Sequence, residues 1–265
     1  MTTEIITSVH NPLVKRWRQL GKSSKQRHLE QSFLVEGTHS LMEALRCASA
    51  LEVVGATADW QAKHPELVQE IYCQGLRLIT LSPPVVASIA TQVQPDGVVA
   101  IAPMRFIPPQ ITSFAVALWY IQDPGNMGTL IRSGVAAGID GLIISGNSVD
   151  VTNPKIIRAT AGQWWRCPMH ITDNFVLALQ TYQQQGLQIV ATRAGANRSL
   201  WQWDFTQPTI LLLGNEGNGL SPELEQLADV CVAVPVQSAV ESLNVAIVGA
   251  LLMYEVLRQR RQGEA

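Results

Sequence analysis

The sequence lacks the marks of a disulfide-linked, metal-binding or membrane-spanning protein. Four cysteines are scattered along 265 residues, with no C-x-x-C pair and no histidine at metal-ligand spacing. No apolar run approaches the roughly 18 residues that cross a bilayer. The first ten residues lack the apolar core and cleavage site of a signal peptide. We therefore expect a cytoplasmic protein with no membrane partner, no metal and four reduced, mostly buried thiols.

Two phosphate-binding patterns are also missing. The glycine-rich loop L-L-L-G-N-E-G-N-G-L at 211–220 has no G-K-[ST] and does not offer G-x-G-x-x-G for a dinucleotide. Its only ionised side chain is Glu216, which makes a phosphate a poor ligand. Glycines let a main chain approach a ligand closely, which suits the edges of an adenine. A carboxylate nearby tolerates a cationic ligand such as a sulfonium.

Charge is unevenly distributed in this chain, whose net charge is only −2. The stretch 5–29 holds six cations and no acid, with a tryptophan among them. Cations neutralise phosphates and an indole stacks on a base, so the stretch predicts an RNA-binding arm. A solvated helical face is the alternative. The candidate RNA-binding residues are Lys15, Arg16, Trp17, Arg18, Lys22, Lys25 and Arg27.

The order of apolar runs predicts an α/β protein with a mainly parallel sheet, because short runs rich in Val, Ile and Leu alternate with segments of helical period. Segment 103–112 contains three prolines and reads as a linker. We therefore predict an N-terminal domain at 1–105 and a C-terminal domain at 113–265. Expected strands lie at 33–37, 51–57, 77–81, 96–102, 116–122, 141–146, 188–194, 209–214 and 230–235, before a closing helix from about 243 to 261.

Two further segments contain candidate functional residues. At 121–138, a strand end leads into a D-P-G-N turn and a helix, which places Asn126 and Arg132 near the carboxyl end of a strand, where α/β proteins bind ligands. An ordinary turn and a surface cation are the alternative. At 234–261, Ser242 is explained as a helix N-cap. Asn244 is not, because positions 245–253 hold no other polar residue and should be almost entirely buried.

Three motifs together resemble the SpoU/TrmH family of SPOUT methyltransferases, which transfer a methyl group from S-adenosylmethionine to a ribose 2′-hydroxyl in RNA. The motifs are D-P-G-N-M-G-T-L-I-R, L-G-N-E-G-N-G-L, and V-P followed by S-L-N-V-A, in the family's order and spacing. The stretch 145–162 is similar to the family's sequence between its first two motifs. The first half resembles the ribosomal-protein-like RNA-binding domain of rRNA-modifying members, in N-P-x-V-K and F-L-V-E-G. One departure is Gln237-Ser238-Ala239, where relatives commonly have glycines.

The resemblance implies the fold, the assembly and the cofactor site. The C-terminal SPOUT domain would contain a parallel sheet and a deep trefoil knot, which is rare in proteins. It would follow a smaller α/β RNA-binding domain and form a homodimer. The residues that would bind S-adenosylmethionine are Thr192, Gly214, Val234 and Leu243.

The resemblance also implies the catalytic set. It comprises Arg132, Asn126, Glu216, Ser242 and Asn244. Because a guanidinium stays protonated in proteins, we expect Arg132 to hold an RNA phosphate and stabilise alkoxide charge rather than act as a base. Asn126 and Ser242 would position Arg132 and the ribose. Glu216 would orient the arginine, and Asn244 would hold the loops in register.

The substrate expected from the sequence is ribosomal RNA rather than transfer RNA, because a full N-terminal domain is retained. A transfer-RNA methyltransferase of the same family and a non-catalytic RNA-binding protein on this fold stay open as alternatives. A nicotinamide-dependent oxidoreductase is disfavoured because the dinucleotide fingerprint is missing. Binding of S-adenosylmethionine, of NAD or of neither separates these classes.

Overall fold

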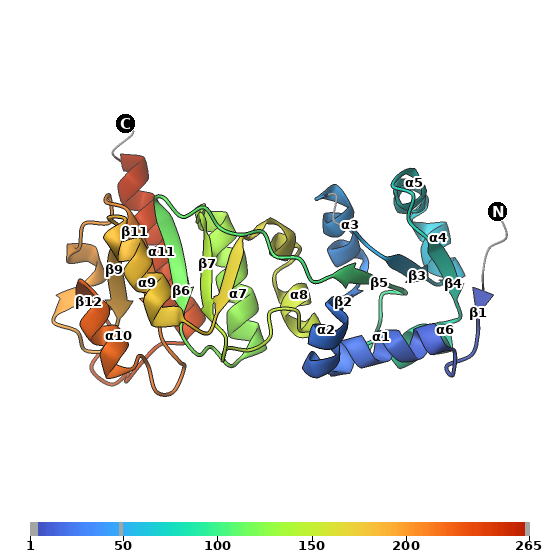
Figure 1. Cartoon of the computed structure of the whole chain (residues 1–265), viewed down its shortest axis with the longest axis horizontal. Helices are drawn as coiled ribbons and strands as arrows, with labels where there is room; N and C mark the ends of the chain where they lie inside the picture. Colours follow the sequence, from blue (N-terminus) through green and yellow to red (C-terminus); the bar gives the residue numbers. More distant parts are fainter. Residues whose placement is uncertain (1–4, 48–49, 263–265) are drawn as a thin grey trace. The chain divides into compact units, whose positions relative to one another are not determined.

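A computed structural model describes residues 5–47 and 50–262 of the chain (Figure 1). The chain forms two compact units. The N-terminal unit comprises Met1–Arg105 and Asp150–Arg166, and the C-terminal unit comprises Phe106–Val149 and Cys167–Ala265. The chain therefore passes between the units at three places, whereas the sequence led us to expect a single linker.

The N-terminal unit is built on a five-stranded mixed sheet of order β1-β4-β3-β5-β2. β5 runs antiparallel to both β2 and β3, and the other pairs are parallel. The strands are β1 (Ile5–Ile6), β2 (Ser32–Glu36), β3 (Val53–Ala56), β4 (Leu78–Leu81) and β5 (Val98–Pro103). The helices are α1 (Pro12–Lys22), α2 (Ser24–Glu30), α3 (Thr38–Arg46), α4 (Ala58–Lys63), α5 (Pro65–Cys73), α6 (Pro83–Ile89), α8 (Pro154–Ala159) and the 3₁₀ helix η1 (Gln163–Arg166).

Helix α1 packs one face into the core of this unit. The Asn11 side chain accepts a hydrogen bond from the Leu13 N–H and caps the helix, which begins at Pro12. Trp17 lies in the buried cluster between α1 and the sheet. A Cβ on Gly55 of β3 would come within 2.6 Å of the Trp17 ring, so the glycine makes room for the indole.

The segment Asp150–Arg166 belongs to the N-terminal unit because buried charges hold it there. The Arg27 guanidinium is almost fully buried and contacts Asp150 at 2.6 Å. Arg158 donates to the buried carboxylate of Glu36 at 2.9 Å. The Trp164 ring packs on Phe33 at 4.9 Å between centroids. These side chains are a long way apart in sequence, so the spacing of apolar residues gave no sign of the contact.

The C-terminal unit contains a fully parallel seven-stranded sheet of order β10-β12-β9-β11-β6-β7-β8. The expected α/β fold with a parallel sheet is confirmed. The strands are β6 (Phe114–Leu118), β7 (Gly141–Ser145), β8 (Met169–Thr172), β9 (Gln188–Thr192), β10 (Arg198–Ser199), β11 (Thr209–Leu213) and β12 (Val230–Ala233). The helices are α7 (Pro124–Ala137), α9 (Phe175–Gln184), α10 (Pro222–Leu227), α11 (Val245–Gln262) and the 3₁₀ helix η2 (Leu200–Gln202).

The closing helix α11 departs from the sequence expectation in two ways. Asn244, not Ser242, caps it, since the Asn244 side chain accepts hydrogen bonds from the N–H groups of Ala246 (2.9 Å) and Ile247 (3.3 Å). The helix is also not almost entirely buried after the cap. Gly249 lies so close to α7 and β11 that an added Cβ would meet Leu130 at 2.5 Å, whereas the opposite face of the helix is exposed.

The cysteines are free thiols, as expected, but only one of them is buried. Cys167 is buried, Cys73 is exposed, and Cys47 and Cys231 are intermediate. Burial raises the pKa of the Cys167 thiol to about 12. Within residues 5–47 and 50–262, no helix is long and apolar enough to span a membrane. The same ranges contain no His, Cys, Asp or Glu cluster that could hold a metal ion.

Candidate cofactor and catalytic site

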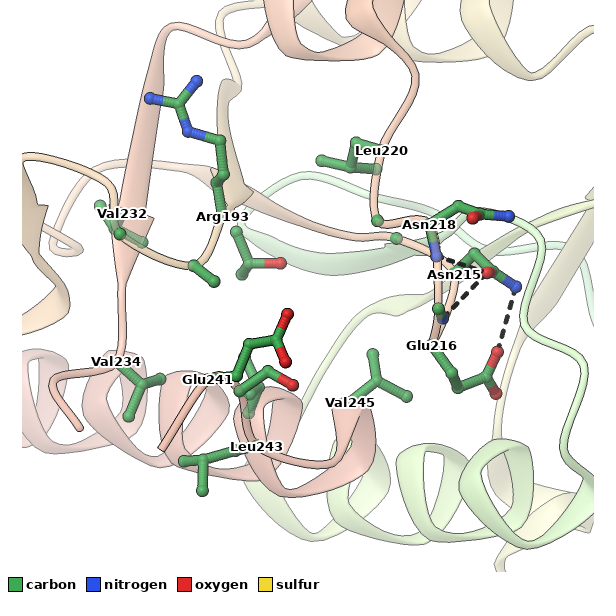
Figure 2. A pocket seen from close by; sticks show the side chains of 18 of the residues that line it. Arg193, Asn215, Glu216, Asn218, Leu220, Val232, Val234, Glu241, Leu243 and Val245 are labelled. Atoms are coloured by element: carbon green, nitrogen blue, oxygen red, sulfur yellow. Dashed lines mark hydrogen bonds between the residues drawn. The ribbon is translucent and has the colours of Figure 1, made fainter. Parts of the chain in front are cut away.

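A cavity of about 360 Å³ opens at the carboxyl ends of three strands of the C-terminal unit (Figure 2). Thr192 is the last residue of β9, while Gly214 and Val234 directly follow β11 and β12. Leu243 closes the cavity from the segment before α11. All four predicted cofactor residues therefore line one cavity, and Glu216 and Ser242 of the predicted catalytic set line it too. The carboxyl end of a parallel sheet is the usual place for such a site.

The loop after β11 folds back on itself, and its glycines serve that closure. The N–H of Asn215 donates to the Gly219 carbonyl and the N–H of Gly219 donates to the Asn215 carbonyl, both at 3.0 Å. A Cβ on Gly214 would lie 2.4 Å from the Gly219 carbonyl carbon. Gly219 has φ +67°, a conformation that favours glycine. Gly214 and Gly219 are therefore needed by the loop itself, a role that the sequence did not indicate.

Hydrogen bonds join the three motifs. The Asn126 amide donates to a Glu216 carboxylate oxygen at 3.1 Å, and the Asn244 amide donates to the Asn126 side-chain oxygen at 2.8 Å. The Glu216 carboxylate also accepts from the N–H groups of Gln122 and Asp123. The structure therefore brings together three predicted residues from three separate segments, with Asn244 holding two of the loops in register.

The pKa of Glu216 lies below its ordinary value. Partial burial by itself raises the pKa, but the hydrogen bonds from Asn126 and from the backbone N–H groups of Asp123 and Gln122 stabilise the anion and outweigh it. Glu216 is therefore a fixed negative charge beside the cavity.

Arg132 stands apart from this network. It lies on α7, is exposed, and does not line the cavity. No described residue forms an ion pair or hydrogen bond with its guanidinium. The expectation that Glu216 orients Arg132 is corrected, since the Glu216 carboxylate holds the turn that begins α7. Its oxygens are already occupied by amide donors.

The sequence reasoning missed three charged residues of the cavity, Arg193, Glu225 and Glu241. Arg193 forms an ion pair with Glu225 at 3.1 Å. Two of them had a sequence signal, because Arg193 follows the strand-terminal Thr192 and Glu241 precedes Ser242 in the third motif. Glu225 lies on α10 and had no such signal.

Two of the predicted RNA-binding side chains are part of the N-terminal core. Trp17 is fully buried, so it cannot stack on a base without unfolding α1 from the sheet. Arg27 is equally inaccessible, because its guanidinium is held by Asp150, by the Leu20 carbonyl at 3.0 Å and by the Thr152 hydroxyl. Both predictions are wrong for the same reason: the residues lie on the inner faces of α1 and α2.

The remaining cations of the stretch 5–29 fall into two groups, those with partners in the N-terminal unit and those without partners among the described residues. Arg16 is ion-paired with Glu30 and Glu52, so much of its charge is neutralised by acids that lie outside the acid-free stretch. Arg18 donates to the Val9 carbonyl at 2.9 Å. The three that are exposed and have no partner among the described residues are Lys15, Lys22 and Lys25.

Comparison with known proteins identifies two matched regions of the chain. Residues 113–254 match the SpoU rRNA Methylase family, and residues 11–100 match the MRM3-like substrate binding domain. The chain belongs to the SpoU rRNA methylase family. The match contains all three motifs and every residue that lines the cavity.

Relatives and solved structures cover nearly the whole chain. A protein of Synechocystis described as an uncharacterized tRNA/rRNA methyltransferase is 39% identical over 98% of this chain and 96% of its own. The 23S rRNA (guanosine(2553)-2′-O)-methyltransferase RlmP of Bacillus subtilis is 26% identical over 95% and 98%. An AdoMet-bound rRNA methyltransferase from Sinorhizobium meliloti superposes with a TM-score of 0.85 at 29% identity, covering 97% of this chain and 98% of that one.

Proposed function

We propose that this protein transfers a methyl group from S-adenosylmethionine to a ribose 2′-hydroxyl in ribosomal RNA. One observation carries the proposal: a single cavity gathers the predicted cofactor residues and is joined by hydrogen bonds to the first and third motifs. Transfer RNA is the alternative substrate. Ribosomal RNA is favoured because characterised relatives are named as 23S rRNA 2′-O-methyltransferases.

The cavity fits the cofactor in size and charge. Ligand cavities commonly measure about 300–1,000 Å³, and this one measures about 360 Å³. Gly214, Val234 and Leu243 offer backbone groups and apolar surface for an adenosine, and the acidic lining is compatible with a cation. When bound, S-adenosylmethionine supplies a methyl group on a positively charged sulfur.

The residues around the cavity have separable roles in the proposal. Glu216, Asn126 and Asn244 fix the three loops relative to each other, so that the ribose meets a pre-formed site. Ser242 lines the cavity and positions the ribose. Arg132 has a planar fork of donors that no described residue engages, which suits the phosphate beside the reacting ribose and the alkoxide charge that develops there.

The two parts of the chain divide the work in this proposal. Residues 1–105 bind the RNA, in agreement with the match to a substrate binding domain, and residues 113–265 hold the cofactor and the catalytic residues. Lys15, Lys22 and Lys25 are the cations available for phosphates. We place the enzyme in the cytoplasm.

The assembly we propose is a homodimer through the C-terminal unit, with the trefoil knot of the SPOUT class. A stripe on α11 supports the dimer, because Ile247 (52% exposed), Leu251 (44%) and Tyr254 (52%) recur at helical spacing on one face. Apolar side chains gathered in this way mark an interaction surface. Membership of the SpoU family supports the knot.

Arg132 provides the test of the proposal. Arg132→Ala should abolish transfer of labelled methyl into ribosomal RNA yet preserve folding and cofactor affinity, because the arginine acts on charge that is present only when RNA is bound. Arg132→Lys keeps the charge but loses the fork, so activity should fall nearly as far. Full activity of the alanine variant would remove Arg132 from the mechanism. Absence of methyl transfer by the unaltered protein to any ribosomal RNA would contradict the proposed function.

A further inference from the structure

The cavity carries more negative than positive charge. Its lining includes three carboxylates, Glu216, Glu225 and Glu241, and one guanidinium, Arg193, and its other lining residues are uncharged. Two of the carboxylates are engaged, Glu216 by amide donors and Glu225 by Arg193. Glu241 makes no hydrogen bond or ion pair with any residue in the described ranges. It is the carboxylate that remains available to a ligand.

The position of Glu241 is set by the backbone of its own segment and not by side-chain contacts with other described residues. A turn in which the Val240 N–H donates to the Gln237 carbonyl at 2.9 Å precedes it, and Ser242 and Leu243 follow. Figure 2 shows its carboxylate among the lining side chains, between the wall formed by Arg193 and Val232 and the start of α11 at Val245. Any ligand that fills the cavity has to lie close to this charge.

We propose that Glu241 is a specificity-determining residue that makes the cavity prefer the sulfonium cofactor over its thioether product. The inference rests on the proposed function. Methyl transfer forms a bond between carbon and the ribose oxygen and breaks the bond between carbon and sulfur. The electron pair of the broken bond stays on sulfur, and the hydroxyl proton passes to water. The positively charged sulfonium thus becomes a neutral thioether, S-adenosylhomocysteine.

The Glu241 carboxylate, which has no partner among the described residues, favours the ligand that carries the sulfonium charge. A charge in a partly enclosed cavity interacts with a nearby ion more strongly than it would in bulk water. Because no residue in the described ranges donates to the Glu241 carboxylate, a nearby sulfonium gains this interaction, whereas the thioether sulfur of the product carries no charge and does not. Glu216 contributes less to the preference, since N–H groups already stabilise its anion, and the charge of Glu225 is offset by Arg193. The product is then released more readily than the substrate.

The test compares three ligands by isothermal titration calorimetry. These are S-adenosylmethionine, S-adenosylhomocysteine and sinefungin, which carries an ammonium group in place of the sulfonium. Glu241→Gln removes the charge and keeps the size of the side chain. Glu241 is exposed, so we expect the preference for S-adenosylmethionine over S-adenosylhomocysteine to fall roughly 1.4- to fivefold, the range for an exposed charge pair. Sinefungin should weaken in parallel with S-adenosylmethionine, and the affinity for S-adenosylhomocysteine should stay unchanged.

A matched control separates the local effect from net charge. Glu223→Gln removes the same charge from α10, at an exposed position that does not line the cavity, and should leave the preference unchanged. Equal weakening of all three ligands by Glu241→Gln would overturn the inference, because it would indicate a contact with a group that the three ligands share. Loss of turnover with unaltered affinities would overturn it as well. If the unaltered protein bound none of the three, the proposed function itself would have failed.

Discussion

At the scale of single residues, Glu216 shows how one carboxylate can be structural and electrostatic at once. Its anion accepts N–H donors from the turn that opens α7 and the Asn126 amide, so the group that borders the cavity also fixes the first motif. Its lowered pKa means that the anion contributes to stability. The contribution is present above the ordinary value of 4.5 and is lost as pH falls through the lower pKa of the folded state.

Replacing Glu216 tests that linkage. Glu216→Gln should lower the free energy of unfolding in urea at pH 7, because an amide accepts these N–H donors less strongly than an anion does. The deficit should shrink as pH falls below the ordinary value of 4.5 and should be lost as pH falls through the lower pKa of the folded state. Glu241→Gln is the control, since that carboxylate has no donor among the described residues and its loss should alter stability little at either pH. A deficit that stayed constant with pH would contradict the assignment.

The sequence identified part of the site. Asn126, Glu216 and Asn244 were found by family motif, and the structure links them directly. The role of Trp17 was misjudged because a basic, aromatic stretch looks the same in sequence whether its indole faces solvent or a sheet. The deciding fact is Gly55, a residue on another element that leaves room for the ring.

At the scale of elements, strands with long apolar runs were predictable and short ones were not. The apolar run of β11 is buried on both faces, and β9 is buried at its three central positions, so both were predicted clearly. β8 has exposed positions in the middle of its pattern, and β1 and β10 are two residues long, so none of them contains enough signal. The residue that caps α11 was also predicted wrongly. Ser242 and Asn244 have comparable capping propensity, and only the backbone geometry distinguishes them.

At the element scale, we predict that the exposed lysines of α1 and α2 bind RNA phosphates. Replacing Lys15, Lys22 and Lys25 by Ala should weaken RNA binding and reduce the slope of log affinity against log salt by about two to three, since each phosphate contact contributes about 0.7–0.9. S-adenosylmethionine affinity should not change. The control is Lys63→Ala, an exposed lysine on α4. An unaltered salt slope would show that these lysines form only a solvated face.

Trp17→Ala cannot serve as the corresponding stacking test. Removing a fully buried indole costs about 3–5 kcal/mol of stability, and Trp17 is fully buried. Loss of RNA binding in that variant would therefore report unfolding of the N-terminal core. The lysine variant avoids this difficulty because its side chains are exposed.

At the scale of the whole molecule, one segment of the C-terminal half of the sequence belongs to the N-terminal unit. No local sequence pattern could reveal this. The segment Asp150–Arg166 leaves the C-terminal unit between β7 and β8 and completes the N-terminal unit. Its anchoring pair, Arg27 with Asp150, joins residues from opposite halves of the chain. Breaking a buried pair leaves an uncompensated charge, typically at a cost of about 3–5 kcal/mol. The N-terminal unit therefore depends on a segment that lies within the family match of the C-terminal one.

The proposed dimer is tested on the exposed stripe of α11. Ile247→Asp combined with Leu251→Asp should convert the protein from dimer to monomer in sedimentation velocity at micromolar concentration, because the two carboxylates would be buried against an apolar partner without compensation. The folded monomer should persist, since both side chains are exposed in the single chain and the core face of α11 is unchanged. Leu177→Asp, at a 61% exposed leucine of α9, is the control and should remain dimeric. A double variant that sedimented as a dimer would place the interface elsewhere, and a monomeric parent protein would remove the homodimer from the proposal.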